Sequence, residues 1–158
     1  MKKIFLLLLI TFSSSSCVEE VVFNNPSVQG KVDNVFWRSA SSKAVIATNG
    51  SMMLTAEVQK QELIIKTSSN TLGTYLLGDG VANTATFIVK NNDNTSIVYI
   101  TGEDIGGEGQ IVITEFDNVN KTISGTFRFN AVNHLDNPLG GEILNFQQGV
   151  FYKVPVTQ

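Results

Sequence analysis

GQIVITEFDNVNKTISGTFRFNAV, residues 109–132, is the stretch that decides the fold, because two runs of alternating apolar and polar residues flank a short polar segment. The second run places five residues on its apolar side: Ile123, Gly125, Phe127, Phe129 and Ala131. Successive side chains of a strand point to opposite faces, so this run predicts a strand with one buried and one solvated face. Asp117, Asn118 and Asn120 suit a turn, which predicts an antiparallel hairpin with a loop of about five residues.

Gly125 interrupts the apolar side of the second strand. A glycine inside a strand commonly marks a bulge or the close approach of another group. We therefore expect an aromatic ring to lie over Gly125.

The rest of the body repeats this pattern in short runs at spacings of about 8 to 12 residues, without a helical period. Ten Phe and only three Pro also favour strands. The sequence predicts an all-β fold, an antiparallel meander of about nine or ten strands that forms a flattened barrel. A Greek-key β-sandwich is the alternative.

The amino terminus has the pattern of a secretory signal peptide. Lys2 and Lys3 precede an apolar run at residues 4–12, and four serines follow at residues 13–16. The apolar run is too short to cross a hydrocarbon core of roughly 30 Å as a helix. We expect residues 1–16 to be a lipoprotein signal peptide.

Cys17 is the only cysteine and directly follows these small residues. Its position resembles a bacterial lipobox, in which the cysteine receives diacylglycerol before the signal peptide is removed, although Ser14 stands where Leu is usual. A lone cysteine in an exported chain has no disulfide partner, which favours lipidation. An ordinary signal peptide with a free thiol is the alternative.

Glu19 and Glu20 follow the cysteine and are similar to the acidic export signal of surface-exposed Bacteroidetes-type lipoproteins. A solvated linker is the alternative for this pair. We expect residues 17–27 to be the lipidated cysteine and its linker, and residues 28–158 to be a single β-domain. The membrane is then the expected partner, through lipid on Cys17, in the outer membrane of the cell envelope.

Charge argues against a nucleic-acid partner. Removal of the first sixteen residues leaves 9 basic and 14 acidic residues, so the formal net charge moves from -3 to -5. A mildly acidic chain without a basic stripe lacks the electrostatic footprint of a nucleic-acid-binding protein.

No motif predicts catalytic, cofactor-binding or metal-binding residues. His134 is the only histidine and lies far from any nucleophile motif, so we expect it to be a surface loop residue. Glu103, Asp104 and Glu108 cluster in a glycine-rich loop, but their spacing differs from that of a calcium loop, and weak calcium binding there stays open. The sequence singles out no carboxylate pair for glycoside hydrolysis.

Three stretches together carry a resemblance to a known family: VDNVFWRSA at residues 32–40, the hairpin at residues 109–132 with its SGTF strand, and GVFYKVP with its G-x-F segment at residues 149–155. They resemble small Bacteroidetes-type outer-membrane lipoproteins catalogued as a domain of unknown function. The resemblance implies an all-β fold and an envelope location, and it implies no activity or site residues. Asp33-Asn34 stands where the resemblance leads us to expect a VDG turn.

We therefore expect a lipid-anchored β-domain at the outer membrane that acts as a non-enzymatic binding module. A structural or accessory subunit of an envelope complex is one alternative, and a hydrolase with an unrecognised carboxylate site is another. An open apolar interior would favour a ligand-binding barrel. A filled interior with an exposed apolar patch would favour an accessory subunit.

Overall fold

The computed structural model describes residues 27–78, 80, 82–102, 104–134 and 137–157. Within these residues all regular structure is β-strand, and no helix has the length and apolar character needed to cross a bilayer. The signal peptide, Cys17, Glu19, Glu20 and Glu103 lie outside the described residues.

Eleven strands form one sheet that is mostly antiparallel. In chain order they are β1 (Ser27–Val32), β2 (Val35–Arg38), β3 (Ser41–Ile46), β4 (Met52–Val58), β5 (Gln61–Thr67), β6 (Gly73–Leu77), β7 (Thr84–Lys90), β8 (Ser96–Ile100), β9 (Glu108–Asp117), β10 (Thr122–Asn133) and β11 (Ile143–Thr157). The all-β prediction is confirmed. The predicted hairpin is also confirmed, as β9 and β10.

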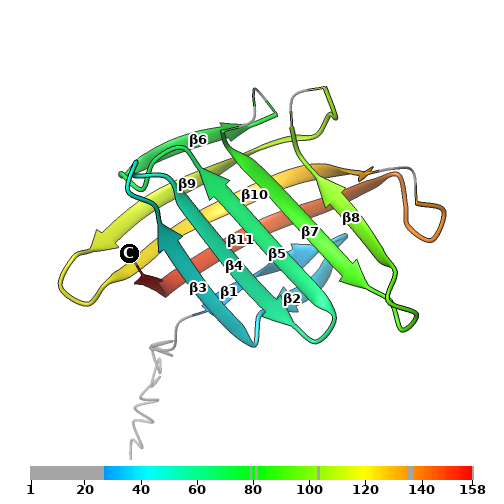
Figure 1. Cartoon of the computed structure of the whole chain (residues 1–158), viewed down its shortest axis with the longest axis horizontal. Helices are drawn as coiled ribbons and strands as arrows, with labels where there is room; N and C mark the ends of the chain where they lie inside the picture. Colours follow the sequence, from blue (N-terminus) through cyan, green and yellow to red (C-terminus); the bar gives the residue numbers. More distant parts are fainter. Residues whose placement is uncertain (1–26, 79, 81, 103, 135–136, 158) are drawn as a thin grey trace, which may run out of the picture.

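The sheet folds over itself into two layers that cross each other (Figure 1). One layer holds β3, β4, β5, β7 and β8, and the other holds β6, β9, β10, β11, β1 and β2. The layers join at two places, where β8 pairs with β10 and where β11 pairs in parallel with β3. The sheet thus closes into a ring, which is close to a barrel.

Three details differ from the predicted meander and its bounds. Asp33 and Asn34 both have positive φ, 47° and 67°, and form a tight two-residue turn that pairs β1 with β2, so residues 32–40 are not one strand. β1 begins at Ser27, the last residue of the predicted linker. β6 does not pair with β5 but with β9 in the other layer, where Tyr75 lies opposite Ile111.

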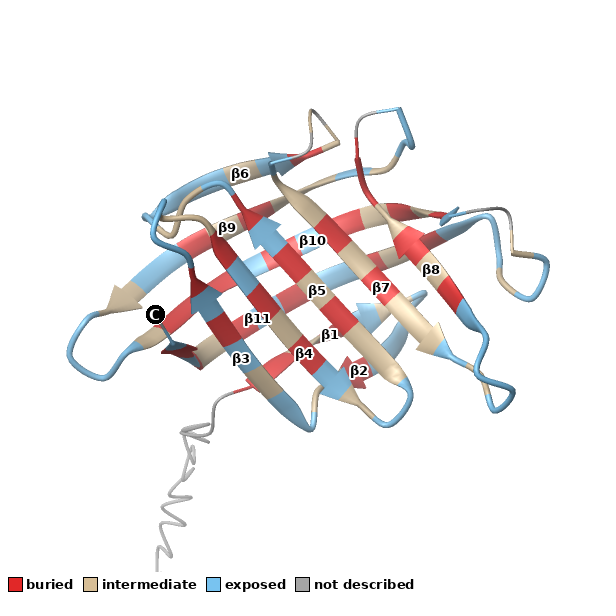
Figure 2. Cartoon of the chain, in the orientation of Figure 1, coloured by how far each residue is buried: buried red, intermediate tan, exposed pale blue. Residues whose placement is uncertain are grey.

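The interior between the layers is filled. Figure 2 shows buried residues alternating with exposed ones along both layers. Six aromatic side chains, from both layers, form the centre of the core: Trp37, Phe87, Phe127, Phe129, Phe146 and Phe151. Their neighbouring rings lie 4.9 to 6.5 Å apart between centroids. The three pairs among Trp37, Phe87 and Phe146 meet edge to face, a favoured geometry for aromatic rings. Such an interior leaves the outer surface for binding.

Glycine makes room for these rings. A Cβ on Gly125 would collide with the ring of Phe151, which confirms the predicted aromatic ring over this position. A Cβ on Gly149 would come within 2.5 Å of Phe127, and a Cβ on Gly30 within 2.5 Å of Phe146. Three strand glycines are thus covered by rings from neighbouring strands.

β11 is one long strand with two bulges, although residues 143–146 and 149–156 read as separate runs in the sequence. Opposite β10, two residues of β11, Gln147 and Gln148, face the single residue Arg128, and Gln148 has a φ of 53°. A second bulge follows at Lys153, whose φ is 47°. Bulges bend and twist a strand, which lets β11 pass from β1 to β3 and join the two layers.

Candidate functional site

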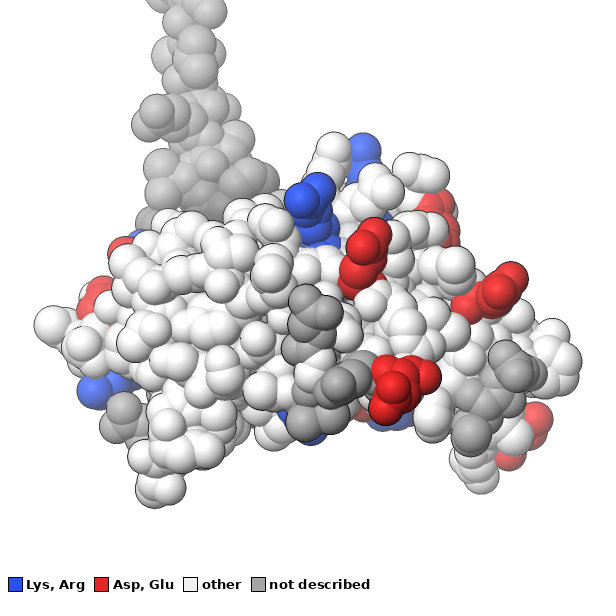
Figure 3. Space-filling view, turned by 90° about the horizontal axis from the view of Figure 1, so that it is seen from above, with Lys and Arg blue, Asp and Glu red and all other residues white. Residues whose placement is uncertain are grey.

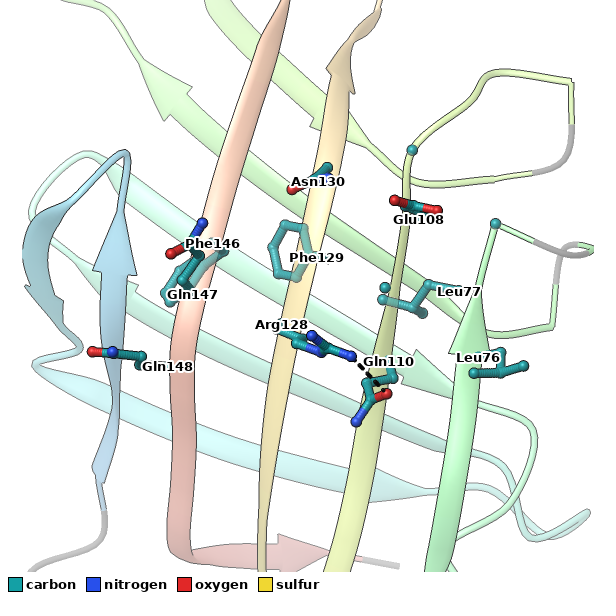
Figure 4. A pocket seen from close by; sticks show the side chains of 13 residues that line it. Leu76, Leu77, Glu108, Gln110, Arg128, Phe129, Asn130, Phe146, Gln147 and Gln148 are labelled. Carbon is teal, nitrogen blue, oxygen red and sulfur yellow. Dashed lines mark hydrogen bonds between the residues drawn. The ribbon is translucent and has the colours of Figure 1, made fainter.

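An open groove of about 940 Å³ lies on the outer face of β6, β9, β10 and β11. We call it the Arg128 groove. Its polar side chains are Glu108, Gln110, Arg128, Asn130, Gln147 and Gln148. Leu76 borders it on β6, and Phe129 and Phe146 lie beneath it as part of the core. Figure 4 shows these side chains spread over four neighbouring strands.

The bulge in β11 positions one wall of the groove. In a regular strand Gln147 and Gln148 would point to opposite faces, so one of them would enter the core. Because the bulge adds a residue opposite Arg128, both glutamines are exposed and both line the groove. Bulges are found frequently beside functional sites, where they re-aim side chains.

The charges of the groove balance, and most of its polar side chains have no hydrogen-bond partner among the described residues. It contains one cation, Arg128, and one carboxylate, Glu108. Arg128 donates a long hydrogen bond of 3.4 Å from Nη2 to Oε1 of Gln110. The side chains of Glu108, Asn130, Gln147 and Gln148 make no hydrogen bond or ion pair to other described residues. These groups are available to a ligand.

A smaller depression of about 370 Å³ continues the Arg128 groove along the same face. It shares Gln110, Arg128 and Gln148 with the groove and adds Thr126 and Val150. The two depressions together form a track across β9, β10 and β11, which suits an elongated molecule.

The glycine-rich loop does not assemble its acidic residues around one point. Asp104 lies exposed in a turn with a φ of 65°, next to the bridge between Gly102 and Gly106. Glu108 begins β9 and lines the Arg128 groove instead. Among the described residues no three or more His, Cys, Asp and Glu side chains lie together as metal ligands would, while Glu103 is outside that set.

His134 is exposed at the end of β10 and borders a separate depression of about 400 Å³, together with Asp93, Asn137 and Leu139. The loop there is held by Asn133, which is buried and donates hydrogen bonds to the carbonyls of Asn137 and Gly141. His134 has no part in that network, which agrees with its prediction as a loop residue.

Among the described residues two carboxyl groups have a lowered pKa, and both lie in hairpin turns rather than in the groove. Hydrogen bonds from the side chain and backbone of Thr95 lower the pKa of Asp93. Hydrogen bonds from the backbone and side chain of Asn120, and from the backbone of Val119, lower the pKa of Asp117. These bonds stabilise turns and account for the lowered values without catalysis.

Sequence reasoning missed most of the Arg128 groove. The sequence pattern places Gln147 and Gln148 in the gap between two runs. It does not distinguish Arg128 from the other polar residues of its strand. Two adjacent polar residues followed by glycine, inside an otherwise alternating pattern, were the available signal of a bulge.

The sequence matches a known protein family. Residues 24–155 match the profile of a domain of unknown function, DUF6252. The chain belongs to the DUF6252 family. No curated protein and no solved structure matches the chain significantly.

The match confirms the resemblance to a family catalogued as a domain of unknown function. It begins three residues before β1 and ends within β11. It covers both walls of the Arg128 groove and all of the ring except Val156 and Thr157, the two residues of β11 that pair with β3. This DUF6252 domain is therefore the unit to which a function must be assigned.

Proposed function

We propose that this chain is a non-enzymatic binding domain, held at the outer membrane by lipid on Cys17, that takes its ligand in the Arg128 groove. The observation that carries this proposal is the contrast between a filled interior and an open outer groove with unpaired polar side chains. A ligand-binding barrel would need an open interior, so binding must occur on the outer face.

The groove favours a polar, hydroxyl-rich ligand such as an oligosaccharide. Its amide side chains offer both donors and acceptors, and Arg128 adds strong donors. Because Arg128 and Glu108 balance each other, the groove offers little attraction to a polyanion or a polycation. The track across three strands also fits a chain of several sugar units.

Binding of soluble oligosaccharides, followed by calorimetry or by NMR shifts of the groove residues, tests this function. Arg128→Ala should weaken binding roughly ten- to hundredfold, since a hydrogen bond to a charged group contributes about 1.5–3 kcal/mol. The double variant Gln147→Ala and Gln148→Ala should also weaken it. Lys43→Ala, an exposed change on β3 in the other layer, is the matched control and should have no effect.

A ligand that binds with shifts outside the groove, or binding that Arg128→Ala leaves unchanged, would contradict this site. The anchor is tested separately. Mass spectrometry of the mature amino terminus should show Cys17 as the first residue with diacylglycerol on its sulfur. An unmodified thiol there would refute the lipid anchor and leave the groove as a separate question.

A second candidate function is an accessory subunit of an envelope complex, and the filled interior together with the exposed apolar surface around β6 favours it. Residues 67–78 contain no charged side chain, and Leu72 and Leu76 are 64% and 57% exposed. Figure 3 looks onto the side of the molecule where β6 lies and shows a broad area with few charged side chains. Exposed apolar patches commonly contact partners.

The size of the native particle distinguishes the two functions. An accessory subunit, extracted from membranes in mild detergent, should run as part of a larger complex, and Leu72→Glu with Leu76→Glu should release it as a monomer. A binding module should run as a monomer with and without these two substitutions.

A further inference from the structure

The β1–β2 hairpin exposes apolar side chains at its tip. Val35 and Phe36 are 70% and 65% exposed, although they are neighbours in β2 and therefore point to opposite faces. The next residue, Trp37, is buried in the aromatic core, and the turn is bound to β11 through hydrogen bonds between Asp33 and Asn145. The tip is thus a firmly held element with apolar groups on both sides.

This hairpin is the first element after the proposed anchor. Nine residues lie between Cys17 and Ser27, and an extended chain over this span of ten Cα-to-Cα steps reaches at most about 35 Å. Phe36 pairs with Lys31, which lies four residues from Ser27. At about 3.4 Å per residue along β1 and about 5 Å between strands, Phe36 lies roughly 15 Å from the start of the domain. The linker can therefore place the hairpin tip on the same bilayer that holds the lipid.

We infer that the tip of the β1–β2 hairpin is a second membrane contact, in which Val35 and Phe36 enter the boundary between lipid headgroups and acyl chains. This inference rests on the proposed lipid anchor. Apolar side chains held near a bilayer gain stability when they enter that boundary. The exposed Lys31, directly opposite Phe36, would meet anionic headgroups at the same depth.

Such a contact would set the orientation of the domain. A lipid on a linker alone lets the domain rotate freely. A second contact holds the tip of the β1–β2 hairpin against the bilayer and so restricts this rotation. The anchor and the hairpin together then determine which way the Arg128 groove faces.

A fluorescent probe at the hairpin tests the contact in the full-length, lipidated protein. Val35→Cys supplies the only free thiol if lipid blocks the sulfur of Cys17, and it can carry the environment-sensitive dye NBD. In vesicles of phosphatidylethanolamine and phosphatidylglycerol, the emission of the dye should move to shorter wavelength. The emission intensity should rise several-fold over that of the same protein kept in solution by albumin, without vesicles or detergent. A lipid-soluble nitroxide should quench it.

Leu72→Cys is the matched control, because Leu72 is similarly exposed but borders β6 rather than the hairpin. Its dye should respond as in water, and Phe36→Ser should weaken the response of the dye at position 35. If the dye at position 35 emits as it does in water, although each chain carries one label, the hairpin contact is overturned. Equal emission changes of the dyes at positions 35 and 72 would overturn it as well. Labelling of the unsubstituted protein at Cys17 would instead refute the lipid anchor.

Discussion

Three glycines of this domain each lie under a phenylalanine ring from a neighbouring strand. The pairs are Gly125 with Phe151, Gly149 with Phe127, and Gly30 with Phe146. The sequence predicted a ring over Gly125 because a small residue interrupted an apolar face. It could not identify the ring as Phe151, since that depends on the bulges that set the register between β10 and β11.

Gly125→Ala should destabilise the fold. The new Cβ would collide with the ring of Phe151 and the carbonyl of Val112, and overpacking of this kind costs about 1–3 kcal/mol. Gly141→Ala is the control, because its Cβ would meet only the carbonyl of Ile143, at 3.9 Å. Thermal unfolding should show a lower Tm for the first variant alone. Equal Tm values for the two variants would show that Phe151 moves aside without cost.

Asp117 makes the stability of the β9–β10 hairpin sensitive to acid. Bonds from Asn120 and Val119 favour the ionised carboxylate and lower its pKa in the folded state. The resulting stability is present above the ordinary Asp pKa of about 3.9 and is lost as the pH falls through the lower folded value. Asp117→Asn should therefore flatten the stability profile in that acidic range.

Carboxyl NMR titration and acid unfolding curves measure this effect. Glu142→Gln removes the same charge from an exposed site outside the hairpin and should leave the slope unchanged. An Asp117 carboxyl that titrates at the ordinary value would refute the role of these hydrogen bonds.

At the scale of the element, β11 decides more of the architecture than the sequence pattern revealed. Alternation predicted two short strands, because the pair Gln147 and Gln148 breaks the period of two. In the structure the pair is a bulge, and the strand continues through it to Thr157. The strands β4, β5 and β7 follow the alternation that predicts a strand, whereas β10 keeps it only from Gly125 onward, since Ile123, Ser124 and Gly125 are all buried.

Gln148 tests the bulge directly. Its φ of 53° lies in the left-handed region, which glycine adopts without strain and β-branched residues avoid. Gln148→Gly should leave the domain at least as stable, because relief of about 1–2 kcal/mol of left-handed strain offsets the entropy that glycine loses on folding, and Gln148→Val should destabilise it. Urea unfolding measures both. The neighbouring Gln147 is the control, since no positive φ occurs there and Gln147→Gly should gain nothing. A more stable Val variant would indicate that the bulge is absent in solution.

At the scale of the whole molecule, the class of fold followed from alternation, but the closure of the ring did not. Pairings between strands far apart in the chain depend on the twist of the sheet and on bulges, and the alternation of apolar and polar residues predicts neither. The parallel contact between β3 and β11 is an example, since Ala44 and its partner Val156 lie 112 positions apart in the chain. The groove stayed hidden because alternation did not show that β6 pairs with β9 or that β11 carries a bulge beside Arg128.

The ring should open first at its two short seams. β11 meets β3 through only two residue pairs, and β8 meets β10 through two, whereas β4 and β5 share seven. Free energies of local opening follow such differences in pairing and burial. Amide hydrogen exchange should therefore be faster in β3 than in β4 and β5.

A chain that ends at Pro155 tests the seam with β3, because it lacks Val156, which is buried, and Thr157. Loss of that buried side chain should cost about 2 kcal/mol or more and should speed exchange in β3 while β9 and β10 stay protected. A chain that lacks only Gln158 is the control. If exchange rises equally in every strand, the ring opens as one cooperative unit and the two layers do not separate at this seam.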